Sequence, residues 1–247
     1  MKIAVIGNGG REHSICVSLN KSKKLSKLYC IPGNGGTSEI AQNVEIDITD
    51  FKKLKDYILL ENIDLVIVGP EKPLVDGLVD FLKKFNIKVF GPNKNASQLE
   101  GSKIFTKEIC KKNNIPTAKF GIFKNKKKSI TFLKESLFPI VIKADNIAAG
   151  KGVYIAENFE EGLQAVNEIF DGKFGVAENI LIEEFLEGEE MSFFILTDGI
   201  TIKEFDTAQD HKRVFDGDKG KNTGGMGCYS PSRLINDELR KKIINQI

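Results

Sequence analysis

The sequence predicts an α/β domain followed by an α+β domain. In the first hundred residues, apolar runs that end in glycine clusters alternate with segments of helical periodicity. Beyond residue 100 the apolar runs are shorter, and helical segments separate only some of them. The 247 residues are 41% hydrophobic and 28% charged, which is typical of a globular protein with a sizeable core. We therefore expect domains over residues 1–101 and 102–247.

The first domain is expected to form a parallel sheet with helices between its strands. Its strands are predicted at 2–6, 28–31, 65–68 and 89–90. Its helices are predicted around 15–19, over 51–59 with Asp50 as the N-cap, and over 74–85. Strand–helix alternation with glycines at the strand ends places ligands at the carboxyl ends of the strands.

A long helix, expected over 97–113, leads into the second domain. The strands of this domain are predicted at 120–123, 140–144, 153–156, 180–184, 192–196 and 200–205. Its helices are predicted at 130–136, at 159–169 and after Asn236 or Asp237, and the lysine-rich segment 124–128 is expected to be a solvated loop. The last helix stops on an apolar residue without a C-cap glycine, which favours a chain cut inside a domain.

Charge, cysteine usage and hydropathy exclude several classes of protein. Lys+Arg 36 against Asp+Glu 34 leaves a net charge of +2, which gives no electrostatic footprint for nucleic acid. The four cysteines are scattered without a Cys-x-x-Cys spacing, which disfavours a disulfide framework or zinc site and fits a reducing cytoplasm. No apolar stretch approaches the roughly 20 residues that span a membrane. The apolar run at the N-terminus is too short for a signal peptide.

The first strand runs into the turn Gly7-Asn8-Gly9-Gly10, which invites comparison with a dinucleotide-binding fingerprint. The third glycine of that fingerprint falls on Glu12. The ribose-binding acid expected roughly 20 to 30 residues later is replaced by a second glycine cluster at 32–36. A nicotinamide cofactor is therefore disfavoured. A helix N-terminus with free N–H groups remains, and Arg11 and His13 beside it favour a bound phosphate over a turn without ligand.

Two further segments suit a polyphosphate ligand, although the sequence has no GxxxxGK[ST] motif. Lys143 ends an apolar strand and the small residues of 148–153 follow, so an ammonium group and several backbone N–H groups come together. The segment 183–190 holds five carboxylates that suit ribose hydroxyls, and the backbone of Phe185 and Leu186 suits an adenine edge. Taken singly, such a lysine is more often solvated and such an acidic segment is more often a turn.

The longest polar stretch of the chain runs over 209–227. It mixes Asp, Lys, Arg and Asn with closely spaced glycines, which favours a binding loop over a disordered linker. His13 and His211 are the only histidines, and no cysteine is in register with either of them. Neither histidine therefore indicates a metal site, and no Ser-His-Asp arrangement is evident.

Taken together, these segments resemble the glycinamide ribonucleotide synthetase (phosphoribosylamine–glycine ligase) family. The matching segments, in the family's order, are 5–13, 32–37, 68–74, 90–92 with 99–103, 142–145 with 148–153, 182–190 and 209–227. They cover nearly all of the chain, and segments 11–13 and 210–227 separate this family from its relatives. The resemblance implies an ATP-grasp domain behind a Rossmann-like N-terminal domain, with a lid over about residues 120–190.

The resemblance implies that glycine is joined to 5-phosphoribosylamine at the expense of ATP, through glycyl phosphate. The products are glycinamide ribonucleotide, ADP and phosphate, and the reaction is the second step of purine synthesis. The implied ATP site comprises Lys103, Lys143, Ala149, Gly150, Lys151, Gly152, Val153, Glu183, Phe185, Leu186 and Glu190. The resemblance implies that the two lysines 103 and 143 hold the phosphates and that the loop 148–153 covers them. It also implies that Glu183 and Leu186 meet the adenine and that Glu190 meets the ribose. The implied substrate contacts are Gly9, Gly10, Arg11, Gly33, Asn34, Gly35, Asp210, Asn222, Thr223, Gly224 and Gly225. The implied catalytic residues are Lys143, Asp210, Lys212 and Arg213.

Family members are longer than this chain, and their ligands for Mg²⁺ or Mn²⁺ lie after the point that corresponds to Ile247. The resemblance therefore implies an ATP-grasp domain that is incomplete at its C-terminus, with no metal ligand in this chain. We expect a cytoplasmic monomer that binds small-molecule substrates and neither nucleic acid nor membrane. Two alternatives stay open: another ATP-grasp ligase of purine synthesis, acting on bicarbonate or formate, and a non-catalytic ATP-binding fragment.

Overall fold

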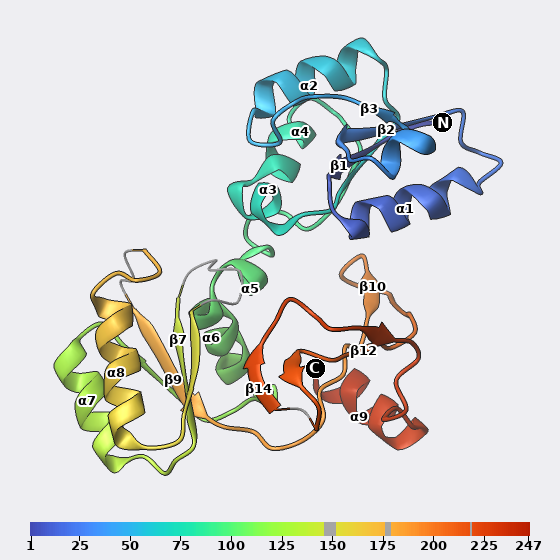
Figure 1. Ribbon diagram of the computed structural model, residues 1–247. Helices are drawn as coiled ribbons and strands as arrows, with labels where there is room; N and C mark the ends of the chain where they lie inside the picture. Colours follow the sequence, from blue (N-terminus) through green and yellow to red (C-terminus); the bar gives the residue numbers. More distant parts are fainter. Residues whose placement is uncertain (146–151, 176–178, 218) are drawn as a thin grey trace. The chain divides into compact units, whose positions relative to one another are not determined.

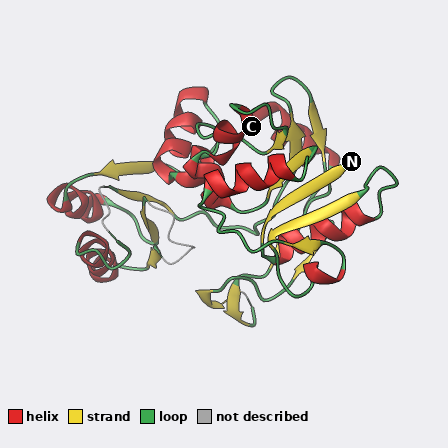
Figure 2. Ribbon diagram, turned by 90° about the horizontal axis from the view of Figure 1, so that it is seen from above, coloured by secondary structure: helices red, strands yellow, loops and turns green. Residues whose placement is uncertain are grey.

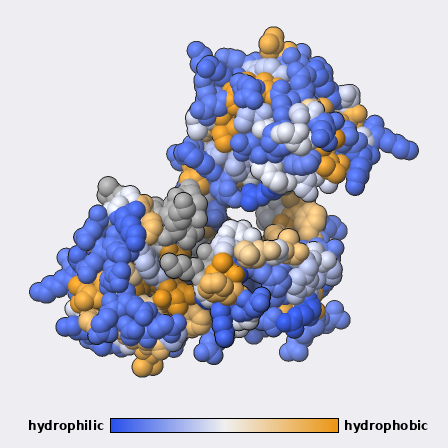
Figure 3. All heavy atoms as spheres, in the orientation of Figure 1, coloured by the Kyte–Doolittle hydropathy of each residue, from blue (hydrophilic) through white to orange (hydrophobic). Residues whose placement is uncertain are grey.

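The chain forms two compact units, Met1–Thr106 and Lys107–Ile247 (Figure 1). The structure is a computed structural model, and it describes residues 1–145, 152–175, 179–217 and 219–247. Within these ranges no helix has both the length and the hydrophobicity needed to cross a membrane. The face drawn in Figure 3 is largely hydrophilic, with hydrophobic residues scattered over both units.

The first unit is built around a five-stranded parallel sheet, which confirms the fold predicted for this region. The strands are β1 (Lys2–Gly7), β2 (Lys27–Pro32), β3 (Gln42–Asn43), β4 (Leu65–Val68) and β5 (Val89–Phe90). Their order is β3-β2-β1-β4-β5, so that Ile6 of the central strand pairs with Ile31 on one side and Val68 on the other. Helices cover both faces, which is why the central strand is a continuous apolar run. The sequence did not predict β3, because its two polar residues form no apolar run.

The helices of the first unit divide between the two faces of the sheet. They are α1 (Gly10–Asn20), the 3-10 turn η1 (Thr37–Glu39), α2 (Phe51–Leu60), α3 (Glu71–Asp76) and α4 (Leu78–Lys83). α1 packs on the face that carries Cys30, whereas α2 and α4 pack on the face that carries Ile31. The prediction of one helix over 74–85 is wrong. Gly77 divides it, because its φ of +97° is a left-handed conformation that ends α3.

The long helix predicted over 97–113 is also divided. α5 (Gln98–Gly101) and α6 (Lys103–Asn113) are separated by Ser102, whose backbone is extended with φ −138° and ψ 116°. The Ser102 hydroxyl accepts a hydrogen bond from Phe105 N at 3.1 Å, as an N-cap residue does for a new helix. The two compact units join within α6.

The second unit opens with a four-stranded antiparallel sheet in the order β6-β9-β7-β8. Its strands are β6 (Phe120–Phe123), β7 (Ile140–Ala144), β8 (Val153–Ala156) and β9 (Ile180–Glu184), all as predicted. Helices α7 (Lys126–Glu135) and α8 (Phe159–Phe170) pack on one face over the buried Ile142 and Ile182 (Figures 1 and 2). The expectation of a loop over 124–128 is wrong in part. Asn125 caps α7 by accepting hydrogen bonds from two N–H groups of its first turn, at 2.8 and 3.3 Å.

Three small antiparallel sheets and a last helix complete the second unit. The strand pairs are β10 (Ile195–Thr197) with β11 (Ile202–Glu204), β12 (Gln209–Asp210) with β15 (Cys228–Tyr229), and β13 (Arg213–Phe215) with β14 (Lys219–Asn222). The last helix is α9 (Asp237–Gln246), and Asn236 caps it by accepting from Leu239 N at 2.8 Å. The polar stretch 209–227 is thus folded into short hairpins. The predicted strands at 192–196 and 200–205 are each shorter than expected.

Glu168 on α8 ties this helix to strand β8. Its carboxylate accepts hydrogen bonds from Lys173 Nζ at 2.6 Å, from Tyr154 Oη of β8 and from Gln164 Nε2 at 2.9 Å. These donors, Lys173 above all, lower the pKa of Glu168 to about 2. Because this folded-state pKa lies below that of the unfolded chain, the ionised carboxylate stabilises the fold above about pH 4.3. The contribution is lost as the pH falls through the folded-state pKa.

We expect Glu168→Gln to lower the free energy of unfolding at neutral pH. The difference from the wild type should shrink as the pH falls from about 4.5 to about 2, where the wild-type carboxylate also becomes neutral. Urea unfolding followed by circular dichroism at several pH values measures this difference. Glu160→Gln changes an exposed residue of the same helix and is the control. A difference that does not vary with pH would contradict the role assigned to Glu168.

Candidate active site

Three turns meet at one edge of the parallel sheet in the first unit. They follow β1, β2 and β4, and parallel strands bring their carboxyl ends to the same edge. Gly33 N donates a hydrogen bond to Gly7 O at 3.2 Å, and Asn34 Nδ2 donates to Asn8 O at 2.8 Å. This edge therefore brings together the predicted substrate residues of the unit, namely Gly9, Gly10, Arg11, Gly33, Asn34 and Gly35.

Glu12 fills the space beneath these turns, at the position of the third fingerprint glycine. The residue is 4% exposed, and its carboxylate accepts a hydrogen bond from Gly9 N at 2.6 Å. A Cβ atom on Gly69 would lie 2.0 Å from Glu12 Oε1, and one on Gly7 would lie 2.6 Å from Glu12 Cγ. From the other side, Arg11 Nη1 donates to Gly69 O at 2.8 Å. The turns after β1 and β4 are thus packed on one buried carboxylate, at positions where only glycine fits.

We expect Gly69→Ala to destabilise the first unit by about 1 to 3 kcal/mol, because the added methyl group overlaps the buried Glu12 side chain. Gly35→Ala is the matched control, since a Cβ atom at that position meets no atom within 4 Å. Thermal unfolding of both variants measures the difference. Equal midpoints for the two variants would show that Glu12 moves aside at little cost.

In the second unit, one face of the antiparallel sheet carries a charged cluster. Side chains alternate along β7, so that Ile142 is buried under α7 and α8 while Lys143 stands on the opposite face. Lys143 is paired in register with Val153 of β8 and with Leu181 of β9. Glu183 follows two residues after Leu181 and therefore stands on the same face as Lys143.

Glu183 is the centre of this cluster. It is 5% exposed and forms ion pairs with Lys143 and with Lys107 of α6, whose Nζ lies 2.6 Å from Glu183 Oε2. Lys107 also donates to Thr117 Oγ1 at 2.6 Å, and its Nζ lies 5.6 Å from the centroid of the Phe120 ring. A buried carboxylate persists only with such compensation. Two ammonium groups, one from β7 of the sheet and one from α6, are therefore held on this face by one carboxylate. Such an arrangement suits the phosphates of a nucleotide.

Lys107 is a candidate residue that the sequence reasoning missed. The resemblance assigned a phosphate contact to Lys103, which begins α6. Lys103 and Lys107 are four residues apart and share one side of the helix, so helical periodicity does not distinguish them. The ion pair with Glu183 identifies Lys107 as part of the cluster, and the role of Lys103 stays a prediction.

A cavity of about 660 Å³ opens beside the same sheet. One wall is the segment 185–190 that follows β9, and another is the segment 209–213, which begins in β12. Ile155 of β8 also lines the cavity. Because Ile155 lies two residues after Val153, the register partner of Lys143, it stands on the face of the charged cluster. The cavity and the cluster therefore share one face of the sheet.

Carboxylates and cations face one another in this cavity. Lys212 forms an ion pair with Glu190, and its Nζ lies 3.9 Å from Asp210 Oδ1. The hydrogen bond with Glu190, more than any other contact, raises the pKa of Lys212. The carboxylates suit hydroxyl groups, whereas Lys212 and Arg213 suit a carboxylate or a phosphate. Glu190, a residue of the implied ATP site, is thus linked directly to Lys212, one of the implied catalytic residues.

The cavity collects residues from both predicted sites. Those that line it are Phe185, Leu186, Glu190, Asp210, Lys212 and Arg213. Thr223 lies next to them, because its N and Oγ1 donate to Lys212 O at 2.7 and 3.0 Å. Gly225 N donates to Thr223 Oγ1 at 3.0 Å, so Gly224 lies in the same turn. Asn222 pairs with Arg213 through the backbone, and its side chain lies outside the described part of the structure.

The loop predicted to cover the phosphates is described only at its end. Gly152 O accepts a hydrogen bond from Ala144 N at 2.9 Å, which brings the end of the loop next to Lys143. The remaining predicted residues of this loop, Ala149, Gly150 and Lys151, lie outside the described residues.

Comparison with known proteins and protein families defines the class of protein. The chain resembles the biotin carboxylase domain of Hydrogenobacter thermophilus 2-oxoglutarate carboxylase, crystallised with MgADP, ADP and bicarbonate. The TM-score is 0.75 at 20% identity, over 98% of this chain and 55% of that one. It also resembles N5-carboxyaminoimidazole synthetase of Staphylococcus aureus, complexed with ADP, with a TM-score of 0.74 at 17% identity over 99% of this chain and 62% of that one. At these identities the likeness concerns the fold alone.

Residues 101–247 match the ATP-grasp (A) domain of phosphoribosylglycinamide synthetase. The class is therefore an ATP-grasp domain behind a parallel N-terminal sheet, as predicted.

The N domain of the same synthetase matches residues 1–100, so two domains of one family account for the whole chain. The chain belongs to the phosphoribosylglycinamide synthetase family. Phosphoribosylamine–glycine ligases of Brucella melitensis and Escherichia coli are each 47% identical to it, over 248 and 251 residues. The crystal structure of the Thermotoga maritima phosphoribosylamine–glycine ligase is similar with a TM-score of 0.84 at 31% identity, over all of this chain and 59% of that one. The chain spans 58% of the length of the Brucella and Escherichia relatives.

Proposed function

We propose that this chain forms the N-terminal and nucleotide-binding parts of a phosphoribosylamine–glycine ligase. The reaction joins glycine to 5-phosphoribosylamine and converts ATP to ADP and phosphate, in the second step of purine synthesis. Membership of the family and the names of its relatives support this proposal. The observation that carries it is the buried Glu183 with its two lysines, on the sheet face that borders the cavity.

The charged cluster and the cavity would share the nucleotide. Lys143 and Lys107 supply positive charge for the phosphates, together with Lys103 and the backbone of the 149–153 loop. The 185–190 wall of the cavity would take the nucleoside: the backbone around Leu186 meets the adenine, and Glu190 accepts from ribose hydroxyls. Binding of this kind works by charge neutralisation and positioning rather than by covalent chemistry of the protein.

The proposed reaction has two steps. A carboxylate oxygen of glycine attacks the γ-phosphorus of ATP, the bond to the β-phosphate oxygen breaks, and glycyl phosphate and ADP result. The amine of phosphoribosylamine then attacks the carbonyl carbon, loses a proton, and phosphate leaves. Asp210, Lys212 and Arg213 would face these substrates, with the turn at 222–225 beside them. The glycine-rich edge of the first unit would contact phosphoribosylamine through Gly9, Gly10, Arg11 and 33–35.

A metal ion, Mg²⁺ or Mn²⁺, accompanies ATP in this proposal, and its ligands are not identified among the described residues. Among them, no group of three or more His, Cys, Asp or Glu side chains is placed to hold a metal. We therefore assign no ligand for Mg²⁺ or Mn²⁺ in this part of the chain and derive no step through the ion. The proposal includes a monomeric protein that acts in the cytoplasm.

ADP release tests the function, with ATP, Mg²⁺, glycine and freshly generated phosphoribosylamine each omitted in turn. Release that needs both glycine and phosphoribosylamine supports the ligase, whereas release that needs bicarbonate or formate instead indicates another ligase of the class. ATP binding without product under any combination indicates a non-catalytic fragment.

We expect Lys107→Met to weaken ATP binding about 10- to 100-fold, the effect of losing one charge-assisted hydrogen bond. Lys112→Met is the matched control, because Lys112 is an exposed lysine of the same helix. Titration calorimetry with ATP measures both dissociation constants, and circular dichroism checks that each variant is folded. Equal affinities for the two folded variants would remove Lys107 from the nucleotide site.

A further inference from the structure

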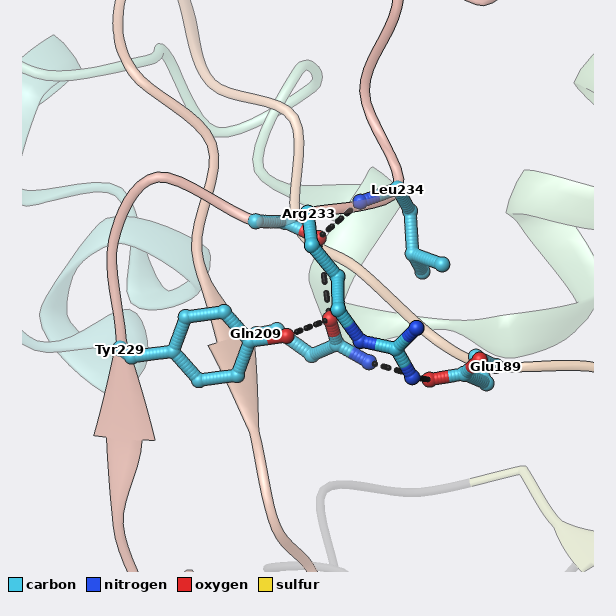
Figure 4. Close-up of polar contacts among 6 residues, drawn as sticks. Glu189, Gln209, Tyr229, Arg233 and Leu234 are labelled. Carbon is cyan, nitrogen blue, oxygen red and sulfur yellow. Dashed lines mark hydrogen bonds and ion pairs between the residues drawn. The ribbon is translucent and has the colours of Figure 1, made fainter.

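Gln209 is a buried polar residue in a segment that otherwise faces the cavity. It begins β12 and is 7% exposed, whereas Asp210, His211 and Lys212 after it are more accessible. Neither the sequence patterns nor the proposed reaction gave Gln209 a role. Its side chain lies between the 185–190 wall of the cavity on one side and the segment 229–234 on the other (Figure 4).

The Gln209 amide is hydrogen-bonded at both ends. Its Oε1 accepts from Tyr229 Oη at 2.5 Å and from Ser232 Oγ at 3.0 Å. Its Nε2 donates to Glu189 Oε2 at 3.3 Å, and Arg233 Nη2 donates to the same oxygen at 2.5 Å (Figure 4). The opposite orientation of the amide would set its oxygen against a carboxylate, so Glu189 fixes which end points outward.

The inner partners of Gln209 are themselves held in place. Ser232 N donates to Thr207 Oγ1 at 3.0 Å, and Ser230 Oγ donates to Thr207 O at 2.7 Å. Leu234 N donates to Ser232 Oγ at 3.2 Å. Thr207 and Ser232 are both buried. The Ser232 hydroxyl that faces Gln209 is therefore a buried, fixed support, whereas the Tyr229 residue is 36% exposed.

These contacts close a ring around one side of the cavity. Glu189 is bonded in the chain to Glu190, which pairs with Lys212. Lys212 is three residues from Gln209, which returns to Glu189 through its amide. The two walls of the cavity are thus joined to each other twice, once by the ion pair of Lys212 with Glu190 and once by the hydrogen bond from the Gln209 amide to Glu189.

We propose that Gln209 is a positioning residue. It fixes the position of the 185–190 wall relative to the 209–213 wall, so that the cavity has the shape that binds the nucleotide. The inference rests on the proposed function, because it takes the occupant of the cavity to be ATP. An amide suits this position, since one end must accept from two hydroxyls while the other donates to a carboxylate. A carboxylate there would only accept, and it would repel Glu189.

Gln209→Glu tests this requirement because protonation restores the missing donor. The charged and titratable groups around the new carboxyl are Glu189 and Arg233 on the outer side and Tyr229 on the inner side. The ring of His211 is stacked on that of Tyr229, with 5.9 Å between the ring centroids. At about pH 8 the carboxylate should weaken ATP binding about tenfold relative to the wild type at the same pH. At about pH 5.5 burial and Glu189 favour the neutral acid, so the affinity should return towards that of the wild type. The wild-type comparison at each pH removes effects of pH that both proteins share.

Two further variants separate positioning from folding. Gln209→Leu keeps the size of the side chain without its hydrogen bonds, and we expect it to bind ATP weakly at both pH values. Gln42→Glu adds the same charge at an exposed position and should match the wild type. Hydrogen exchange should show faster exchange over 187–190 and 210–213 in Gln209→Glu at about pH 8 only, relative to the wild type.

The outcomes are distinct. In one outcome, Gln209→Glu differs from the wild type in ATP affinity and hydrogen exchange by the same amount at both pH values, or at neither. That result would overturn the positioning role and leave the proposed function intact. A folded wild-type chain that does not bind ATP would overturn both. Loss at about pH 8 with recovery at about pH 5.5 is the result we expect.

Discussion

Burial of the Glu183 carboxylate is the constraint on which the antiparallel sheet of the second unit and its uncovered face depend. A carboxylate that is 5% exposed costs several kcal/mol unless cations and hydrogen-bond donors surround it. The chain supplies the cations from two elements, with Lys143 at the end of β7 and Lys107 on α6. Their ion pairs join the helix to the face of the sheet that α7 and α8 leave uncovered. The cavity lies on that same face.

The first unit solves a related problem with the same type of side chain. Glu12 is buried beneath the turns that follow β1 and β4, and glycines at positions 7, 9 and 69 leave room for it. Its partner is a backbone N–H rather than a lysine. In each unit a buried carboxylate therefore organises the groups around it.

Strong local signals allowed much of this structure to be predicted. Apolar runs ending in glycine located β1, β2 and β4, and cap signals at Asp50 and at Asn236 or Asp237 marked where helices begin. Local signals failed where a single residue changes the backbone direction, as at Gly77 and Ser102, or where a two-residue strand such as β3 has no pattern of its own. Pairings between distant segments were the least accessible. Lys107 and Lys103 look alike on a helix, and Gln209 opens an ordinary polar stretch, so only the folded chain reveals their partners.

The pairing of Glu183 with two lysines also determines how an anion enters this site. The two ammonium groups already have a counter-ion, the Glu183 carboxylate, which is part of the protein and cannot diffuse away. A polyphosphate that approaches the two lysines shares them with this internal carboxylate, which stays in place. Because the carboxylate offsets part of the charge of the two ammonium groups, the cluster attracts an anion less strongly than two unpaired lysines would. Ionic strength should consequently affect nucleotide binding here less steeply than it affects sites lined by unpaired lysines.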